Sequence, residues 1–329
     1  MMLLAGDVGG TKTLLGLFRK GRSRPDTIEA RSYRTLDFSN LGALCLQFLR
    51  DTSTNPADIE AASFGVAGPI TGTRAQLTNV PWVVDLDTLR SEVPVPRAYL
   101  LNDLEALAWS VPVLAADEIA VLHEGRPDSE GSVALIAAGT GLGVALLPRI
   151  DGRLVPRASE GGHVDFAPRN TDEQTLATAL IKEYGRVDVE RVVSGPGLAS
   201  IHAILYPHQC ASLTPMPSSD ELPAAISRSA LTATCPLCVR TLECFVSAYG
   251  ASAGNLALTV LSTGGLYLGG GIAPQILPAL RWPAFMRSFL EKSPMDALIS
   301  RIPVKVILNP GAGLLGAASY ADGQLVDSR

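Results

Sequence analysis

Two stretches of the chain share a layout in which two apolar runs flank a glycine-rich turn. The first extends from Met2 to Phe18 and holds the turn GDVGGTKT. The second begins after Ser132 and reads VALIAAGTGLGVALLPR. Each predicts two buried strands joined by a tight turn. Because the layout recurs about 130 residues later, it indicates an internal duplication.

The remaining apolar patterns predict further strands and helices. Strands are expected at 59–68, 97–101, 266–271 and 302–308, and helices at 41–51, 104–110, 240–261 and 313–321. Pro112 ends the second of these helices, and we place a domain boundary near it. The Ser/Pro-rich segment 211–223 is expected to be an exposed loop. Strands and helices mixed throughout predict an α/β fold.

Composition narrows the class of protein. A length of 329 residues is typical of about two domains. Apolar residues make up 47% and charged residues 18%, which favours a packed core over disorder. The net charge of −5 argues against nucleic-acid or acidic-membrane partners. Five cysteines in 329 residues argue against a secreted scaffold held by disulfides. The N-terminus lacks the basic region and the long apolar core of a signal peptide, so a cytoplasmic location is expected.

One segment resembles a membrane span. Residues 244–280 contain no Asp, Glu, Lys or Arg, but seven glycines, Asn255 and two prolines interrupt them. A buried helix, a glycine-rich turn and a buried strand fit this pattern better.

Three glycine-rich turns are candidates for holding phosphates or a nucleoside. GDVGGTKT (6–13) can present successive backbone N–H groups to phosphate oxygens, although it lacks the glycine that a P-loop requires before its lysine. Asp7 at its strand end can face a phosphate-bound Mg²⁺ through water. AAGTGLGVA (137–145) is a second such turn, without the Rossmann spacing, and LGGGIAP (268–274) offers a flat backbone surface. Ordinary hairpin or strand-to-helix turns remain the alternative for all three.

Polar side chains at other turns are candidates for catalysis and for binding a polyhydroxylated ligand. In LNDLEALA (101–108), Asp103 is a candidate general base, with helix capping by Asn102 and Asp103 as the alternative. In SEGGHVDFAP (159–168), Glu160 and His163 can accept from hydroxyl groups. Glu190, which precedes a Gly-Pro-Gly turn, is a further candidate. The alternative is that it is a solvated charge on a helix.

The pair Cys235-Pro-Leu-Cys238 has no second CxxC, so burial is favoured over metal or redox chemistry.

Taken in order, these motifs strongly resemble those of the bacterial glucokinase family, within the sugar kinase/actin/heat-shock-ATPase superfamily. The resemblance covers residues 4 to about 318 and is carried by GDVGGTKT, LNDLEA, AAGTGLGVA, EGGHVDFAP, ERVVSGPGL, AGNLAL and LGGGIAP. It implies a two-lobed actin-like (ribonuclease H-like) α/β fold with duplicated sheet cores and an interlobe cleft. The expected domains are 1–112 with 309–329, and 113–308.

The resemblance also implies transfer of the ATP γ-phosphate to the 6-hydroxyl of glucose. Asp103 would be the general base, and Asn102, Asp103, Glu160, His163 and Glu190 would bind the sugar. The nucleotide would contact Asp7, Gly9, Gly10, Thr11, Lys12, Gly139, Thr140, Gly141, Gly269, Gly270 and Gly271, with Mg²⁺ held near Asp7 through water. A homodimer that binds neither nucleic acid nor membrane is expected.

Some features depart from the family, and two other functions stay open. Lys12 stands where the family often has Asn, and Leu104 and Glu105 stand where it often has an aromatic residue. No cysteine follows His163 until Cys210, so the chain resembles the branch without the Cys-rich zinc motif of ROK-type kinases. The alternatives are a kinase of mannose or an N-acetylhexosamine, and a non-enzymatic sugar sensor.

Overall fold

The chain forms two compact units. The computed structural model describes residues 2–77, 80–207, 210, 213 and 217–326. Unit 1 comprises Met1–Ala116, Pro156–Ala158 and Asn309–Arg329, and unit 2 comprises Asp117–Val155 and Ser159–Leu308. The domain ranges given above, 1–112 with 309–329 and 113–308, stay a prediction.

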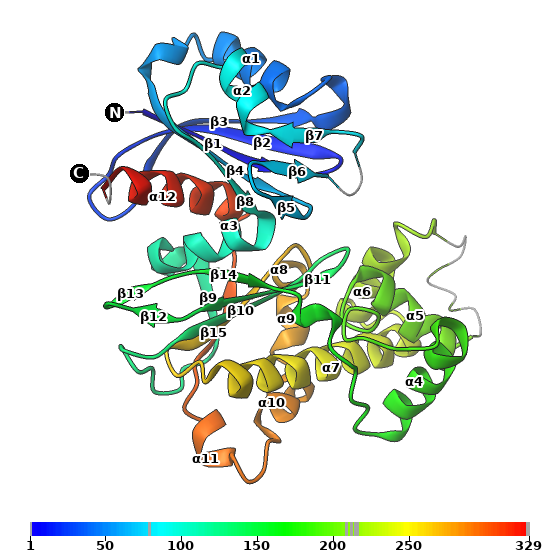
Figure 1. Cartoon of the computed structure of the whole chain (residues 1–329). Helices are drawn as coiled ribbons and strands as arrows, with labels where there is room; N and C mark the ends of the chain where they lie inside the picture. The colour runs from blue at the N-terminus through cyan, green and yellow to red at the C-terminus, as the bar shows by residue number, and fades with distance from the viewer. Residues whose placement is uncertain (1, 78–79, 208–209, 211–212, 214–216, 327–329) are drawn as a thin grey trace. The chain divides into compact units, whose positions relative to one another are not determined.

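Unit 1 is built on a five-stranded sheet of order β3-β2-β1-β4-β8 (Figure 1). The hairpin β1–β2 is antiparallel, whereas β1, β4 and β8 run parallel. The chain between β4 and the next helix forms a separate three-stranded sheet, β5-β6-β7. The strands are β1 (Met2–Val8), β2 (Lys12–Arg19), β3 (Asp26–Arg34), β4 (Ile59–Val66), β5 (Ile70–Thr71), β6 (Arg74–Gln76), β7 (Val83–Asp85) and β8 (Ala98–Asn102).

Helices cover both faces of this sheet. Alternate residues of β1 face opposite sides: Leu4 packs with α1 (Leu41–Asp51) and α2 (Leu86–Glu92), and Leu3 packs with α3 (Asp103–Ser110) and α12 (Ala312–Val326). Strands β1, β2 and β4 are therefore largely buried, which explains why they read as continuous apolar runs, whereas the edge strand β3 is mostly exposed. Figure 1 shows α12 lying along the sheet, and it contacts β1 and β4.

Unit 2 repeats this layout in a six-stranded sheet of order β14-β11-β10-β15-β16-β9. The hairpin β10–β11 is antiparallel, and β10, β15 and β16 run parallel, as β1, β4 and β8 do in unit 1. The strands are β9 (Ile119–His123), β10 (Val133–Ala138), β11 (Leu142–Leu147), β14 (Arg157–Ser159), β15 (Gly265–Gly269) and β16 (Val304–Ile307), and a separate ribbon is formed by β12 (Arg149–Ile150) and β13 (Arg153–Leu154). The shared strand order confirms the predicted duplication of the sheet cores.

The core of unit 2 surrounds the long helix α7 (Pro236–Val260). The hydroxyl of Tyr249 on this helix donates to the carbonyl of Ile136 in β10. A Cβ at Gly250 would lie 2.2 Å, and one at Gly254 2.6 Å, from a carbonyl oxygen of α10 (Pro283–Leu290). Glycine is therefore needed where α7 and α10 pack closely. The other helices are α4 (Thr171–Tyr184), α5 (Gly195–Leu205), α6 (Leu222–Leu231), α8 (Ile272–Gln275), α9 (Leu277–Leu280), α10 (Pro283–Leu290) and α11 (Asp296–Ile299).

Several predicted boundaries were wrong. The last helix extends to Val326 rather than ending at Ala321, because Leu325 still reaches the core beyond the polar Asp322. Helix α7 begins at Pro236 rather than at 240, since proline is tolerated in the first turn. The loop predicted at 211–223 is not wholly exposed, because Leu213 is buried and α6 begins at Leu222. Residues 211–212 and 214–216 of that segment lie outside the described residues.

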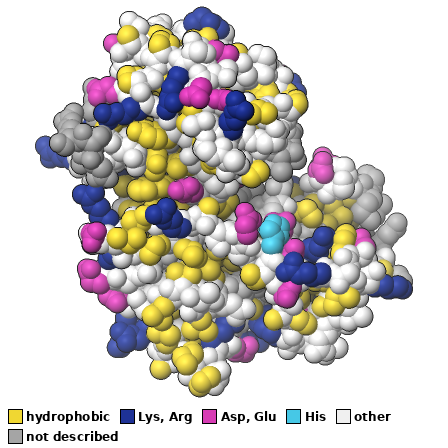
Figure 2. Space-filling view, in the orientation of Figure 1, with side chains coloured by type: hydrophobic (Ala, Val, Ile, Leu, Met, Phe, Trp, Pro, Cys, Tyr) yellow, Lys and Arg dark blue, Asp and Glu magenta, His cyan; other side chains and the backbone are white. Residues whose placement is uncertain are grey.

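The charge-free segment 244–280 forms the end of α7, a glycine-containing turn and β15, as predicted. No single described helix is long and apolar enough to cross a membrane; α6 and α7 pass that test only as a pair, with a bend of 104° between them. On the face shown in Figure 2, Lys and Arg side chains are interspersed with Asp and Glu side chains.

Candidate active site

The first glycine-rich turn of unit 1 joins β1 to β2 and is held from one side by Thr35. Gly9 N donates to the carbonyl of Lys12 over 3.1 Å. Thr35 donates its hydroxyl to the carbonyl of Gly9 over 2.8 Å, and its backbone N–H to the carbonyl of Thr11. Gly10 is half-buried, while Thr11 and Lys12 are exposed. The turn is therefore fixed in shape and keeps two side chains in solvent.

Asn102 and Asp103 lie where β8 ends and α3 begins. The side chain of Asn102 accepts from Leu104 N over 3.0 Å and caps the helix, which confirms the capping interpretation for this residue. Asp103 is the first residue of α3, and its Oδ1 also accepts from Leu104 N, over 2.9 Å. Both side chains are half-buried. The carboxylate of Asp103 is therefore oriented by the first turn of the helix.

Asp7 has the most perturbed carboxyl group of this region. It lies on β1, with Leu14 and Gly65 as its neighbours in the sheet. Its pKa is raised from 3.8 to about 6, mainly by burial and then by the nearby Asp103 carboxylate, while Lys12 acts to lower it. Two neighbouring carboxylates in a partly buried place form a site that a cation would stabilise.

In unit 2, the second and third glycine-rich turns lie side by side because β10 and β15 are parallel neighbours. Ala137 pairs with Gly269, so both strands end at the same edge. Gly139 N donates to the carbonyl of Gly141 over 2.8 Å, and Thr140 is exposed. Gly270 has φ +78, and a Cβ there would lie 2.4 Å from the carbonyl oxygen of Ala138. Glycine is required here for both conformation and space.

Glu190 is tied to the second turn. Its Oε2 accepts from Leu142 N over 2.8 Å, and a Cβ at Gly141 would lie 2.6 Å from the same oxygen. Its own N–H donates to the carbonyl of Gly162, over 3.0 Å. Glu190 is half-buried and precedes α5, so its interpretation as a solvated helical charge is wrong. It joins the turn at 139–142 to the segment that carries Glu160 and His163.

Glu160 directly precedes a short 3-10 turn, Gly161–His163, and His163 is its last residue. Nδ1 of His163 lies 3.3 Å from Oδ2 of Asp188, and its Nε2 lies 3.9 Å from Oε2 of Glu160. If Asp188 accepts the Nδ1 proton, the neutral imidazole presents Nε2 as an acceptor for a ligand hydroxyl. The side chain of Glu160 is 94% exposed and that of His163 50% exposed, so both can be reached from solvent.

The predicted residues thus fall into two sets, one in each unit. Unit 2 brings together Glu160, His163 and Glu190 with the turn at 139–141, and Gly269, Gly270 and Gly271 follow the neighbouring strand. Unit 1 holds Asp7, the turn at 9–12, Asn102 and Asp103. Two supporting residues were missed, Thr35 and Asp188. No local sequence pattern marks Asp188, because it lies 25 positions after the His163 that it contacts.

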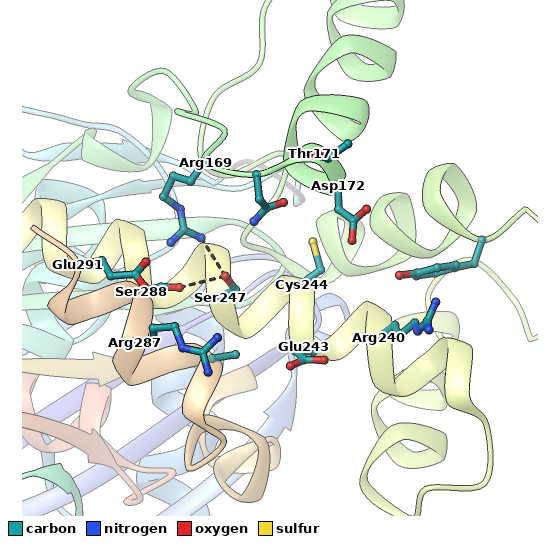
Figure 3. A pocket seen from close by; sticks show the side chains of 13 residues that line it. Arg169, Thr171, Asp172, Arg240, Glu243, Cys244, Ser247, Arg287, Ser288 and Glu291 are labelled. Carbon is teal, nitrogen blue, oxygen red and sulfur yellow. Dashed lines mark hydrogen bonds between the residues drawn. The ribbon is translucent and has the colours of Figure 1, made fainter.

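A pocket of about 600 Å³ on unit 2 contains none of the predicted site residues (Figure 3). It is lined by the start of α4, by α7 and by α10. Arg169 donates to Ser247 over 2.9 Å and pairs with Glu173, and Ser247 lies 3.0 Å from Ser288. Burial, and then the Glu173 carboxylate, raise the pKa of Cys244 in this pocket to about 12. That thiol is therefore protonated at neutral pH and is a poor nucleophile.

Comparisons with known proteins give one consistent result. The family model described as Glucokinase matches residues 4–324. A glucokinase of Nostoc punctiforme is 40% identical over 338 residues, covering 97% of this chain and 98% of its own. A crystal structure of a glucokinase from an Antarctic psychrotroph has a TM-score of 0.84 at 28% identity, covering 98% of this chain and 99% of its own. A ROK family glucokinase from Streptomyces griseus, in complex with glucose and AMPPNP, has a TM-score of 0.65 at 22% identity, covering 98% of this chain and 100% of its own.

Proposed function

The chain belongs to the glucokinase family, has its actin-like ATPase fold and phosphorylates glucose with ATP, and from this premise we propose that Asp103 is the general base and the 6-hydroxyl of glucose the acceptor. The observation that carries this assignment is the position of Asp103. Its carboxylate is half-buried, oriented by Leu104 N at the start of α3, and close enough to Asp7 to raise the pKa of that group.

In the proposed reaction Asp103 takes the hydroxyl proton as the oxygen attacks the γ-phosphorus, and ADP leaves. A positioned carboxylate of this kind contributes about 10²–10⁴-fold to a proton-transfer step. The rest of the catalysis comes from positioning and from stabilising charge on the phosphates. The protein contributes to both through fixed backbone N–H groups, which need no rearrangement during the reaction.

We propose that the other hydroxyls of glucose bind Asn102, Glu160, His163 and Glu190. The grouping of the last three in unit 2 supports this assignment, as does the contact of His163 Nδ1 with Asp188, 3.3 Å away, which fixes the position of the imidazole ring. A polyhydroxylated ligand needs several such partners, because each buried hydroxyl left unpaired costs about 1–3 kcal/mol. A ROK family glucokinase of the same fold was solved with glucose, which agrees with sugar binding on this fold.

We propose that Mg²⁺ binds near Asp7 through water. The residues fit this ion, because carboxylate oxygens suit Mg²⁺ and the pKa of Asp7 is raised by burial and by a second carboxylate. When bound, the ion would neutralise charge on the transferring phosphate. Asp7 would hold the ion through water, and Lys12, at the other end of the turn, would add a positive charge.

The proposed nucleotide contacts are the three glycine-rich turns. The turns Gly9 to Lys12 and Gly139 to Gly141 would contact the phosphates, through backbone N–H groups other than those of Gly9 and Gly139, which already donate within their own turns. Gly269 to Gly271 would face the nucleoside. The AMPPNP complex of the ROK family relative supports nucleotide binding on this fold.

Replacing Gly270 with alanine tests the third turn. The alanine would have to adopt φ +78 and would meet the carbonyl oxygen of Ala138 at 2.4 Å. We expect the free energy of unfolding to fall by about 1–3 kcal/mol and the KM for ATP to rise. Gly271→Ala is the matched control for stability, because Gly271 has φ −73 and no atom within 4 Å of a Cβ. Equal stability of the two variants would contradict the requirement for glycine at 270.

The acceptor is tested by a coupled assay of ADP release with MgATP across a panel of hexoses. We expect the highest kcat/KM with glucose. A higher value with mannose or with an N-acetylhexosamine would keep the mechanism and replace the acceptor. A folded protein that binds sugar and turns over none of the hexoses would support the sensor hypothesis instead.

We further propose that the enzyme is a cytoplasmic homodimer that binds neither nucleic acid nor membrane. The family resemblance supports the dimer and the compartment. The net charge of −5 and the interspersed charges of the visible face support the absence of a polyanionic partner (Figure 2).

A further inference from the structure

Three cysteines of unit 2 meet in its core, at the start of α7. Cys235 is the N-cap residue of that helix, Cys238 lies in its first turn, and Cys210 comes from the segment after α5. All three are buried, with exposed fractions of 5%, 0% and 4% respectively. Their sulfur atoms all lie within 4.8 Å of one another.

One of the sulfur–sulfur separations matches that of a tetrahedral thiolate site. Cys210 and Cys235 are joined as a disulfide, and the Sγ of Cys238 lies 3.7 Å from the Sγ of Cys210. Metal–sulfur bonds of about 2.3 Å in a tetrahedral site place the sulfurs about 3.8 Å apart. The separation of Cys210 and Cys238 is therefore the one that a shared Zn²⁺ requires.

The positions of Cys235 and Cys238 favour thiolates. A CxxC pair at a helix start is a frequent metal-binding arrangement, and the N-terminal end of a helix stabilises negative charge. Ordinary core packing accounts for the burial of the three residues. It does not account for the convergence of three thiols from two segments that α6 separates in the sequence.

We propose that the reduced Cys210, Cys235 and Cys238 thiols bind one Zn²⁺ ion. A dithiol reductant first opens the Cys210–Cys235 disulfide, donating two electrons and two protons and becoming a disulfide itself. Three S–H protons then leave as three Zn–S bonds form, and water or one further side chain completes the tetrahedron. The ion ties Cys210 to the start of α7. This proposal is independent of the proposed catalytic roles, because none of the three cysteines belongs to that machinery.

The test is a metal titration of the reduced full-length chain. The protein is reduced with dithiothreitol, desalted without oxygen and titrated with Co²⁺. We expect one Co²⁺ per chain, thiolate-to-cobalt charge-transfer absorption and the d–d bands of tetrahedral Co²⁺, all removed by one equivalent of Zn²⁺. A folded, reduced protein without these bands would overturn the proposal.

Two serine variants separate this site from the other thiols. Cys238→Ser is expected to weaken Co²⁺ binding at least tenfold, whereas Cys244→Ser, further along the same helix, is expected to leave it unchanged. Equal Co²⁺ binding by the two variants would contradict the assignment. Circular dichroism and glucose-dependent turnover report whether each variant is folded, and both should persist in Cys238→Ser.

The wild-type chain provides a second test that needs no variant. Zn²⁺ should raise the Tm of the reduced protein, because a ligand that binds only the folded state stabilises it. The disulfide form should show neither the rise in Tm nor the cobalt bands. Equal metal binding by the reduced and disulfide forms would place the metal elsewhere and overturn the proposal.

Discussion

Asp103→Asn is expected to lower kcat by about 10²–10⁴-fold while changing the binding of glucose by only a few-fold. The substitution keeps the size of the side chain and an Oδ1 that can accept from Leu104 N, so α3 should begin as it does in the wild type. What it removes is the basic oxygen that takes the hydroxyl proton. Steady-state kinetics of ADP release gives kcat, and equilibrium titration with glucose gives the affinity.

The matched control is Asp87→Asn, the same substitution in the first turn of another helix of unit 1. Asp87 is the second residue of α2, and its side chain is 77% exposed. It should retain wild-type kcat. Near-normal turnover in Asp103→Asn would mean that another group accepts the proton. Loss of glucose binding together with turnover would instead make Asp103 a sugar ligand.

The central strands of both sheets could be predicted from hydrophobic pattern and glycine position, together with the helices α1, α3, α7 and α12. The two runs that flank each turn, Met2–Val8 with Lys12–Arg19 and Val133–Ala138 with Leu142–Leu147, form the hairpins at the centres of the two sheets. These strands are largely buried and carry strong apolar signals. The mostly exposed edge strand β3 carries no such signal and was missed, as were α2, α4, α5, α6 and α10. The end of α12 was missed because Asp322 and Gly323 interrupt the pattern, although Leu325 continues the buried face.

Residues of the candidate site could be proposed from the sequence only where polar side chains lie at turns. Asp103, Glu160, His163 and Glu190 follow strands or flank glycines, where polar side chains stand out in the sequence. Thr35 was not found, because its contact with the turn at 9–12 depends on the pairing of β2 with β3. Local sequence patterns cannot show which side chains a sheet brings together from distant segments.

The cysteines illustrate the same limit. Reading Cys235 and Cys238 along the chain predicted burial, and both are buried. Their partner, Cys210, precedes α6 and reaches them only when that helix folds onto α7. The absence of a second CxxC in the sequence therefore did not exclude a third sulfur in space.

Glu190→Gln is expected to raise the KM for glucose about 10- to 100-fold, the second-largest effect we anticipate. A hydrogen bond to a charged group contributes about 1.5–3 kcal/mol, and each 1.4 kcal/mol is a factor of ten in affinity. The glutamine keeps an oxygen for Leu142 N, so the turn at 139–142 should stay in place and the KM for ATP should change much less. Kinetics with each substrate varied in turn measures both constants.

A shorter side chain at the same position separates the two contacts of Glu190. Glu190→Asp keeps the charge but draws the carboxylate back from Leu142 N, which it now meets at 2.8 Å. This variant should therefore raise the KM for ATP as well, because the turn that carries Gly139 to Gly141 loses its support. Glu183→Gln, on the exposed surface of α4, is the control and should change neither constant. If Glu190→Gln keeps the wild-type KM for glucose, Glu190 supports the phosphate turn alone and does not bind the sugar.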